Sequence, residues 1–209
     1  MIRKFGLTTI IAALALPAFA QTEPAPQLVL APAEILAVAK AAFSPMCDFE
    51  GEAGPEQRYT AYELTYKNEG DAPDQAAKKA TLHELFCLSG AYDVVTVYLL
   101  TKEDEGTQPV QFAAPAFRPI YENDDSEKAV LRIDIGGFTT LNMLVNASFD
   151  AQTGTMTHFS KWRGVSDAGS NGTWKFLGGQ FVLTHFEVDA SYDGEINPSV
   201  IYDSAPETP

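Results

Sequence analysis

The chain has 209 residues, 45% of them hydrophobic, which is enough for a globular core, and 28 acidic against 14 basic residues give a formal net charge of −14. This balance argues against nucleic acid as a partner, because phosphate binding needs clustered Lys and Arg. Basic proteins, cationic peptides and divalent cations fit the charge better, although acidity also keeps many exported proteins soluble.

The N-terminus has the pattern of a Sec-type signal peptide. Arg3 and Lys4 precede an apolar run from Phe5 to Leu16, and residues 18–20 form a small-x-small cleavage site. The run is shorter than the roughly 20 residues of a membrane span, so an uncleaved anchor is the less favoured alternative. No cysteine follows the cleavage site, which argues against a lipoprotein. We expect cleavage after Ala20 and a periplasmic protein without membrane insertion, carrying 12 basic and 28 acidic residues.

The first part of the mature chain mixes helix and strand signals. Residues 21–31 are rich in Pro and Ala and indicate a flexible lead-in. Apolar residues at helical spacing predict a short helix over Pro32–Phe43. Alternation with aromatic residues predicts a strand over Tyr59–Tyr66. Asp74–Ala80 favours helix, and Thr81–Leu88 fits a strand better than a long helix.

The middle of the chain predicts one buried strand and then shorter pieces. Val94–Thr101 is almost wholly apolar or β-branched, which is typical of a central strand. Pro109, Pro115 and Pro119 are expected to break the next region into short extended segments, because proline cannot donate to a strand ladder.

Further strands follow. They are expected over Val130–Ile135 and Met143–Phe149. Residues 150–154 predict a turn into another strand over Thr155–Trp162.

The stretch from Phe159 to Val188 predicts a three-stranded antiparallel unit. Asn171-Gly172 and Gly178-Gly179 have the composition of two-residue hairpin turns. The second turn sets a register in which four large apolar side chains share the core-facing side of a hairpin. They are Trp174 opposite Leu183 and Phe176 opposite Phe181.

Taken together, these signals predict an α+β fold that is predominantly antiparallel β, with one or two short helices near the N-terminus. We expect one domain over residues 32–203, or two packed halves over 32–115 and 116–203, both consistent with the length of the chain. A loose tail is expected over residues 204–209.

The two cysteines, Cys47 and Cys87, are expected to form a disulfide in an oxidising compartment. The chain lacks the Cys-x-x-Cys spacing of a redox site, and the distant His158 and His185 do not complete a zinc ligand set. His83, four residues before Cys87, is interpreted as structural. The disulfide would close a loop of about 41 residues and stabilise the fold by roughly 4 kcal/mol.

Two separated segments carry a family resemblance. The first is Cys87-Leu88-Ser89-Gly90-Ala91-Tyr92-Asp93, which resembles a Cys-x-x-Gly-Ala-Tyr-Asn element. The second comprises Leu144-Val145-Asn146, Phe149-Asp150, Thr153-Gly154, Phe159-Ser160-Lys161, Arg163-Gly164, Asp167, Gly169, Trp174 and Phe181-Val182-Leu183. Together they resemble the bacterial domain-of-unknown-function family 1176, from about Cys87 to Pro206. The resemblance implies an exported protein with no established reaction.

One departure from the family pattern involves a pair of positions. Members usually have Gly-Asp-Cys-Gly before the tryptophan hairpin and a second cysteine just after it. Here Ala168 and Ala190 stand at those positions. If the two cysteines pair in relatives, the resemblance implies that this chain has lost a disulfide, and alanine is small enough to fill a buried half-cystine site.

Catalytic motifs are missing from the sequence. It contains no Gly-x-Ser-x-Gly, His-Glu-x-x-His, Walker or dinucleotide glycine motif. Pairs of carboxylates are too common in so acidic a chain to indicate glycosidic chemistry. An enzyme is therefore disfavoured, and no cofactor is expected.

The motif Asp189-x-Ser191-x-Asp193-Gly194-x-Ile196 matches the first half of a calcium loop. However, Val200 stands where such a loop needs a bidentate glutamate, and the preceding segment is a predicted strand. A plain turn is favoured over a metal site.

Lys161, Arg163 and Asp167 form a charged cluster ahead of the tryptophan hairpin, in a chain where positive charge is scarce. They are the candidate binding residues, for an anion or a protein partner. The favoured alternative is structural: Arg163 and Asp167 would fix the loop through an ion pair and backbone hydrogen bonds.

These observations predict a non-catalytic binding or accessory factor of the cell envelope, whose partner is an envelope protein or a small ligand. A first alternative is a hydrolase that acts on envelope polymers through carboxylates. A second is an acidic protective binder of cationic peptides or basic lytic enzymes.

Overall fold

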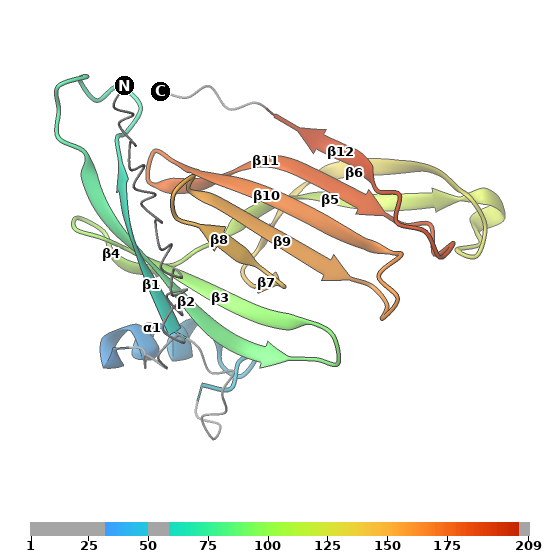
Figure 1. Cartoon of the computed structure of the whole chain (residues 1–209), viewed down its shortest axis with the longest axis horizontal. Helices are drawn as coiled ribbons and strands as arrows, with labels where there is room; N and C mark the ends of the chain where they lie inside the picture. Colours follow the sequence, from blue (N-terminus) through green and yellow to red (C-terminus); the bar gives the residue numbers. More distant parts are fainter. Residues whose placement is uncertain (1–31, 50–58, 205–209) are drawn as a thin grey trace, which may run out of the picture.

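The computed structural model describes residues 32–49 and 59–204, which form mostly antiparallel β-strands with a helix near the N-terminal end (Figure 1). The predicted α+β fold class is confirmed. The elements are α1 (Ala33–Phe43), β1 (Tyr59–Tyr66), β2 (Lys78–Ser89), β3 (Val94–Lys102), β4 (Gly106–Pro109), β5 (Phe112–Tyr121), the 3₁₀ turn η1 (Glu122–Asp124), β6 (Val130–Leu141), β7 (Leu144–Val145), β8 (Ser148–Asp150), β9 (Thr155–Lys161), β10 (Gly169–Leu177), β11 (Gln180–Asp189) and β12 (Ser199–Asp203).

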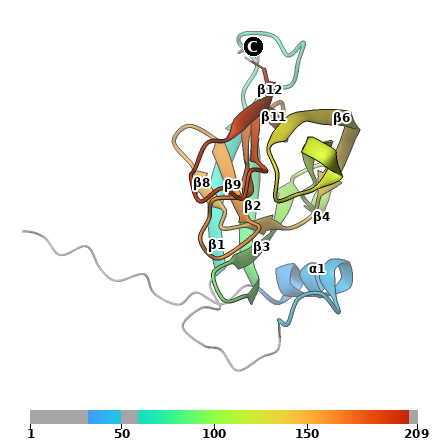
Figure 2. The ribbon, with the colours of Figure 1, turned by 90° about the vertical axis from the view of Figure 1, so that its right-hand side faces the viewer.

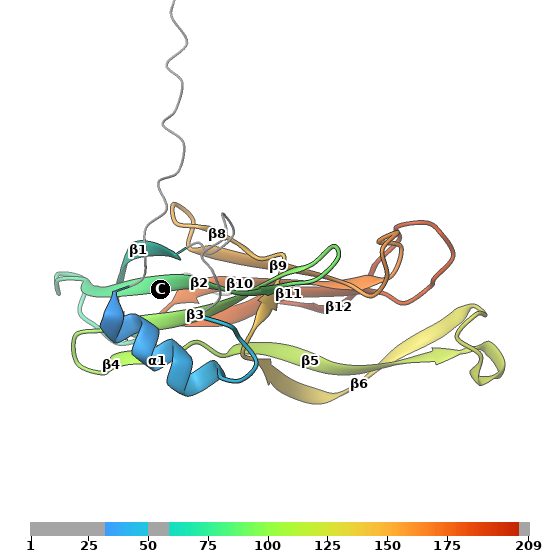
Figure 3. The ribbon, with the colours of Figure 1, turned by 90° about the horizontal axis from the view of Figure 1, so that it is seen from below.

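The strands of the described residues form two five-stranded sheets and a two-stranded ribbon. The first sheet has the order β1-β2-β3-β4, with β7 also paired to β3, the second has the order β12-β11-β10-β9-β8, and the ribbon is β5-β6. The ribbon and the second sheet lie as two layers, and the ribbon runs out beyond the first sheet (Figure 3). The helix α1 lies against the first sheet, far from β12 (Figure 2).

A large core fills the space between these layers. Trp174 on β10 is fully buried, and its ring centroid lies 5.3 Å from that of Phe112 on β5. The Trp174 Nε1 donates a hydrogen bond to the Ala113 carbonyl at 2.8 Å, so the indole also joins the second sheet to the ribbon. The members of this core come from both 32–115 and 116–203, and β5 itself crosses that boundary.

A smaller core lies under α1 on the other face of the first sheet. Ile35, Ala39 and Phe43 recur every four residues and are the buried side of the helix. The helix predicted over Pro32–Phe43 is confirmed, with Pro32 in the cap position and Ala33 as the first helical residue.

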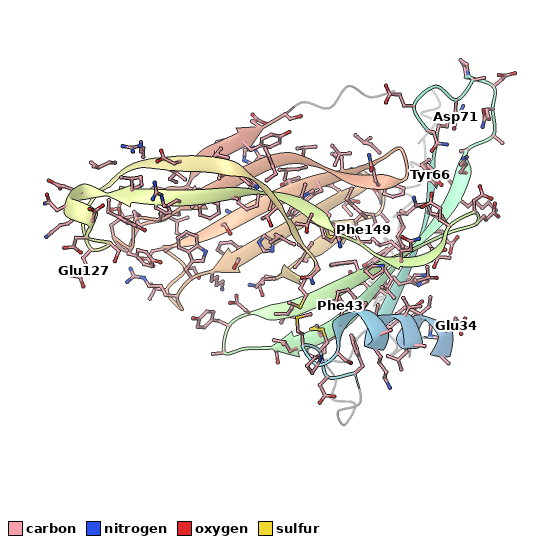
Figure 4. The ribbon with its side chains drawn as sticks, turned by 180° about the vertical axis from the view of Figure 1, so that it is seen from behind. Glu34, Phe43, Tyr66, Asp71, Glu127 and Phe149 are labelled. Atoms are coloured by element: carbon pink, nitrogen blue, oxygen red, sulfur yellow. A yellow bond between two sulfur atoms is a disulfide. The ribbon has the colours of Figure 1, made fainter. Side chains whose placement is uncertain are left out.

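The expected disulfide between Cys47 and Cys87 is also confirmed. The two Cα atoms lie 4.6 Å apart, and both cysteines are buried. Figure 4 shows the disulfide next to Phe43 at the end of α1. The bond therefore ties the chain that follows α1 to β2.

Strand predictions are confirmed where the sequence pattern is strong. The predicted strands at Tyr59–Tyr66, Thr81–Leu88 and Val94–Thr101 are β1, β2 and β3, and β3 is central, with β2 on one side and β4 and β7 on the other. The segments Val130–Ile135 and Thr155–Trp162 lie in β6 and β9, which ends at Lys161, and the turn at 150–154 is present.

The hairpin of β10 and β11 has the predicted register. Trp174 lies opposite Leu183 and Phe176 opposite Phe181. Gly178 and Gly179 make the turn and have φ angles of 57° and 78°, which explains why this position takes glycine.

The predicted hairpin turn at Asn171-Gly172 is wrong. Both residues lie inside β10, and residues 162–168 make the connection from β9. A Cβ at position 172 would collide with the indole of Trp174. Glycine is therefore needed here for close packing against Trp174 and makes no turn.

The helix favoured over Asp74–Ala80 is wrong as well. Residues 73–75 form a turn and a bend, and β2 begins at Lys78, which pairs with Tyr66. Ala80 is buried in the large core. Pairing with β1 overrides a weak local preference for helix.

The expected break at prolines is only partly correct. Pro109 ends β4, whereas β5 runs unbroken through Pro115 and Pro119. A strand tolerates proline when the missing N–H faces away from its partner, and β5 pairs with β6 alone among the described strands.

The single strand predicted over Met143–Phe149 is divided into β7 and β8. Asn146 between them has a φ of 45°, in the left-handed region, which interrupts the strand.

The predicted signal peptide (1–20), lead-in (21–31) and last tail residues (205–209) lie outside the described residues. Within the described ranges, none of the helical segments is both long and apolar enough to cross a membrane.

Candidate functional site

Three chain segments that carry the family resemblance meet at one place, which we name the convergence site. They are residues 87–93 in the hairpin of β2 and β3, residues 144–146 at β7, and residues 159–169 from β9 into β10. The tip of the β2–β3 hairpin and the loop after β9 lie side by side (Figures 1 and 3). The Tyr92 ring covers Gly164, where an added Cβ would lie 3.5 Å from the Tyr92 Cε1.

Asn146 joins the three segments through hydrogen bonds. Its side-chain Oδ1 accepts the Val94 N–H at 2.9 Å. Its Nδ2 donates to the Asp93 carboxylate at 2.8 Å and to the Phe159 carbonyl at 3.1 Å. One side chain therefore links the first sheet to the second, and its left-handed backbone is the conformation that asparagine tolerates better than most residues.

His158 lies buried behind this contact. Its Nδ1 accepts the Val145 N–H at 3.0 Å, so the ring supports β7 in its unprotonated form. Burial lowers the pKa of His158 from 6.5 to about 4, and the nearby Asp93 carboxylate only partly opposes this shift. The imidazole is neutral at neutral pH.

We expect His158 to make the protein sensitive to mild acid. Because the folded pKa lies below the unfolded value of 6.5, stability is complete above that value and is lost as pH falls toward 4. Between about pH 7 and pH 5 the free energy of unfolding should fall by roughly 2 kcal/mol from this residue. Urea unfolding at both pH values measures the loss.

Two variants separate this effect from general acid sensitivity. His158→Gln keeps an acceptor for the Val145 N–H but does not titrate. Its free energy of unfolding should therefore fall less between about pH 7 and pH 5 than that of the wild type. His185→Gln, at a half-exposed histidine of β11, is the control for replacing a histidine outside this buried contact. An unchanged loss in His158→Gln would contradict the prediction.

Arg163 and Asp167, two of the candidate binding residues, form a bidentate ion pair. The Arg163 Nε donates to Oδ1 of Asp167 at 2.6 Å, and a terminal guanidinium nitrogen donates to Oδ2. Asp167 is buried and also accepts the Gly194 N–H at 2.8 Å. The Arg163 hydrogen bonds lower the pKa of the Asp167 carboxyl to about 2.

The same pair fixes the loop between β11 and β12. Arg163 donates to the Tyr192 carbonyl at 2.9 Å, and its guanidinium lies 5.3 Å from the centre of the Tyr192 ring. The contacts are those of the structural interpretation, in which the ion pair holds a loop. Lys161 lies apart from the pair, with its Nζ 5.8 Å from the centre of the Phe159 ring.

The calcium-like motif folds as a turn. Asp189 accepts the N–H groups of Ser191 at 3.1 Å and Asn197 at 2.7 Å, and Asp193 accepts the Glu195 N–H at 2.9 Å. These carboxylates serve the backbone of their own loop. Across residues 32–49 and 59–204, no three His, Cys, Asp or Glu side chains group to hold a metal ion.

Sequence reasoning missed two polar clusters on the first sheet. The two ring nitrogens of His83 form hydrogen bonds with the hydroxyls of Tyr59 and Thr101, each at 2.8 Å, which fits its predicted structural role. On the other face, Glu84 receives the Tyr62 hydroxyl at 3.2 Å, and burial raises the pKa of this carboxyl. Each cluster joins different strands, so no local spacing could have indicated it.

The convergence site presents apolar side chains to solvent. Tyr92 is 45% and Val165 70% exposed, and Leu88 and Val94 nearby in the hairpin are exposed as well. The side chains of Asn146, Arg163 and Asp167 are used in contacts within the protein, whereas Tyr92 and Val165 face solvent.

Comparison with known proteins places the chain at family level. A sequence model of one protein family, described as protein of unknown function (DUF1176), matches residues 12–195. No curated protein and no solved structure matches the chain. The match includes every segment of the convergence site and ends within the loop that Arg163 holds.

Proposed function

The chain belongs to the DUF1176 family of proteins of unknown function, and from the geometry of its family segments we propose that it is a non-catalytic binding or accessory factor of the cell envelope. The partner is an envelope protein that contacts the convergence site. The role of the buried polar contacts is to hold the two loops of this site in place.

One observation carries the proposal: the segments that match the family hold exposed apolar side chains on loops that are firmly fixed. Soluble proteins rarely expose a contiguous apolar patch without an interaction to serve. Aromatic residues on fixed supports are favoured at protein interfaces, because little conformational entropy is lost when they bind. Tyr92 over Gly164 meets this description.

The predicted export supports the envelope as the proposed place of action. The predicted signal peptide over residues 1–20 and the disulfide both belong to an oxidising compartment. Fractionation of cells followed by N-terminal sequencing is the direct check, with Gln21 as the expected first residue of the periplasmic protein.

The hydrolase alternative has less support. It needs two carboxyls with raised pKa values facing one cleft. Burial raises the pKa of Glu84, but this carboxylate already accepts the Tyr62 hydroxyl within the first sheet. The acidic-binder alternative predicts that capture of partners disappears at high salt, whereas apolar contacts at the convergence site predict capture that persists.

We expect Tyr92→Ser with Val165→Ser to abolish partner capture from periplasmic extract, because both exposed side chains are removed without touching the buried contacts. The matched control is Ile196→Ser with Val200→Ser, which removes side chains that are 72% and 55% exposed but lie outside the family match. Affinity capture with quantitative mass spectrometry compares the two variants with the wild type.

The decisive result is the difference between the variants. The proposal is supported if proteins captured by the wild type are lost with Tyr92→Ser/Val165→Ser and retained with Ile196→Ser/Val200→Ser. Equal capture by all three proteins, with unchanged melting temperatures, would contradict it.

A further inference from the structure

The ribbon has a long unpaired strand edge. β6 has 12 residues and pairs with β5 along one edge only, because no other described strand bonds to it. The other edge strands of the described sheets, β1, β4, β8 and β12, have eight residues or fewer. A long free edge offers a row of N–H and C=O groups to another strand.

The second strand of the ribbon is a poorer template. Pro115 and Pro119 in β5 are four residues apart, so their missing N–H groups belong to the same edge. This edge is the one that faces away from β6, so the outer edge of β5 lacks two hydrogen-bond donors. β6 contains no proline and keeps its full set of backbone donors.

Side chains on β6 are more apolar than a solvated edge requires. Leu131 is 61% and Ile135 44% exposed, and Phe138 further along is also exposed. Leu131 and Ile135 lie on either side of Ile133, two residues away in each direction. Natural edge strands normally carry charges at such positions to prevent association.

The charges on β6 are self-complementary. Arg132 and Asp134 lie on the face of the ribbon opposite to Ile133, and the Arg132 Nε donates to the Asp134 Oδ1 at 2.8 Å. Arg118 faces Asp134 from β5, with a nitrogen 3.9 Å from the carboxylate. The carboxylate of Asp134 thus has a second cation close by.

We propose that β6 pairs antiparallel with β6 of a second copy of this chain, with Ile133 of the two copies opposite one another. In this register Arg132 lies opposite Asp134 of the second copy, twice by symmetry. The exposed side chains of Leu131 and Ile135 come together at the ends of this pairing. The two ribbons become one four-stranded sheet centred on the regular run from Arg132 to Ile135, which lies between the bulges of β6 at Leu131 and Gly136. The contact is a closed two-fold interface.

Charge selects this register over its neighbours. If the pairing is centred on Asp134 instead of Ile133, the two Asp134 carboxylates lie opposite one another. If it is centred on Arg132, the two Arg132 side chains do. Like charges directly opposite one another destabilise a strand pair. Of these three registers, only the one centred on Ile133 places Arg132 opposite Asp134 of the second copy.

The test is a charge-exchange series on the full mature protein. R132D and D134R each place like charges opposite in both pairs, and each should raise the dimer dissociation constant by roughly tenfold or more. R132D/D134R restores opposite charges and should recover dimerisation. Arg118 would then face an arginine at position 134, but its side chain is exposed and free to turn away. Sedimentation velocity across a concentration series gives the dissociation constants.

Further variants keep the outcome clear if a charge variant is poorly folded. I135K removes an apolar contact from an exposed position and should abolish the dimer, whereas Ile196→Lys, at an exposed position in the loop between β11 and β12, should not. A wild type that stays monomeric at every concentration overturns the proposal, as does a dimer that R132D and I135K leave unchanged. The Tyr92→Ser/Val165→Ser variant should still dimerise, so this proposal and the proposed function fail separately.

Discussion

Replacement of both Cys47 and Cys87 by alanine is expected to lower the free energy of unfolding by roughly 4 kcal/mol. The disulfide closes a loop of about 41 residues, and its loss gives that loop its full freedom in the unfolded chain. The folded protein also loses a buried link between the end of α1 and β2. Since α1 otherwise depends on Ile35, Ala39 and Phe43 for its contact with the first sheet, this corner should open first.

Urea unfolding of the double variant against the wild type measures the global loss, and the wild type in reducing buffer should reproduce it. Hydrogen exchange tests the location: amides of α1 should exchange faster, while those of β10 and β11 keep their relative protection. Equal unfolding midpoints for the variant and the wild type would show that packing alone holds α1.

The sequence predicts strands well where local alternation and tertiary burial agree. β1 has the predicted bounds, and the β10–β11 hairpin has the predicted register, because Gly178-Gly179 and the apolar residues on both strands indicate the same pairing. The errors occur where a residue is needed for close side-chain packing or lies at a sheet edge. Gly172 serves the Trp174 ring, and Pro115 and Pro119 lie on an edge strand.

The candidate site was predictable only in part. Arg163 and Asp167 are four residues apart in a family segment, so their pairing and its loop-holding role could be anticipated. The role of Asn146 could not, because its three hydrogen-bond partners come from two other segments of the chain. The sequence does not indicate the role of His158 either, because its burial depends on how β7 meets β9.

The two proposed surfaces lie on different parts of the fold. The convergence site belongs to the hairpin of β2 and β3 and the loop after β9, whereas the free edge belongs to the ribbon, whose far tip carries Glu127 (Figure 4). A dimer through β6 would therefore carry two convergence sites. Two linked sites raise the apparent affinity for a partner that is itself repeated, without any new contact.

The Ala168→Cys/Ala190→Cys variant should form a disulfide and gain about 3 kcal/mol of stability. The pairing of Gly169 with Asp189 places residue 168 opposite residue 190 at the end of β10 and β11. Both alanines are buried. Opposed residues of antiparallel strands have Cα atoms about 4.5 to 5.5 Å apart, which is within the range that a disulfide spans.

This outcome would connect the family pattern to the fold. Cysteines at these two positions in relatives would lie face to face, so the paired loss of both thiols is what the register predicts when one disulfide disappears. The new bond would close a loop of about 22 residues that contains the whole hairpin, and would lie beside Asp167, which holds the loop after β11.

Thiol titration and thermal melting measure the result, with a rise of roughly 10 °C in the melting temperature expected for a chain of this size. Each single cysteine variant is the control, because it adds a buried thiol without a bond. Two free thiols in the oxidised double variant, or a melting temperature below that of both single variants, would show that positions 168 and 190 do not face one another as the register requires.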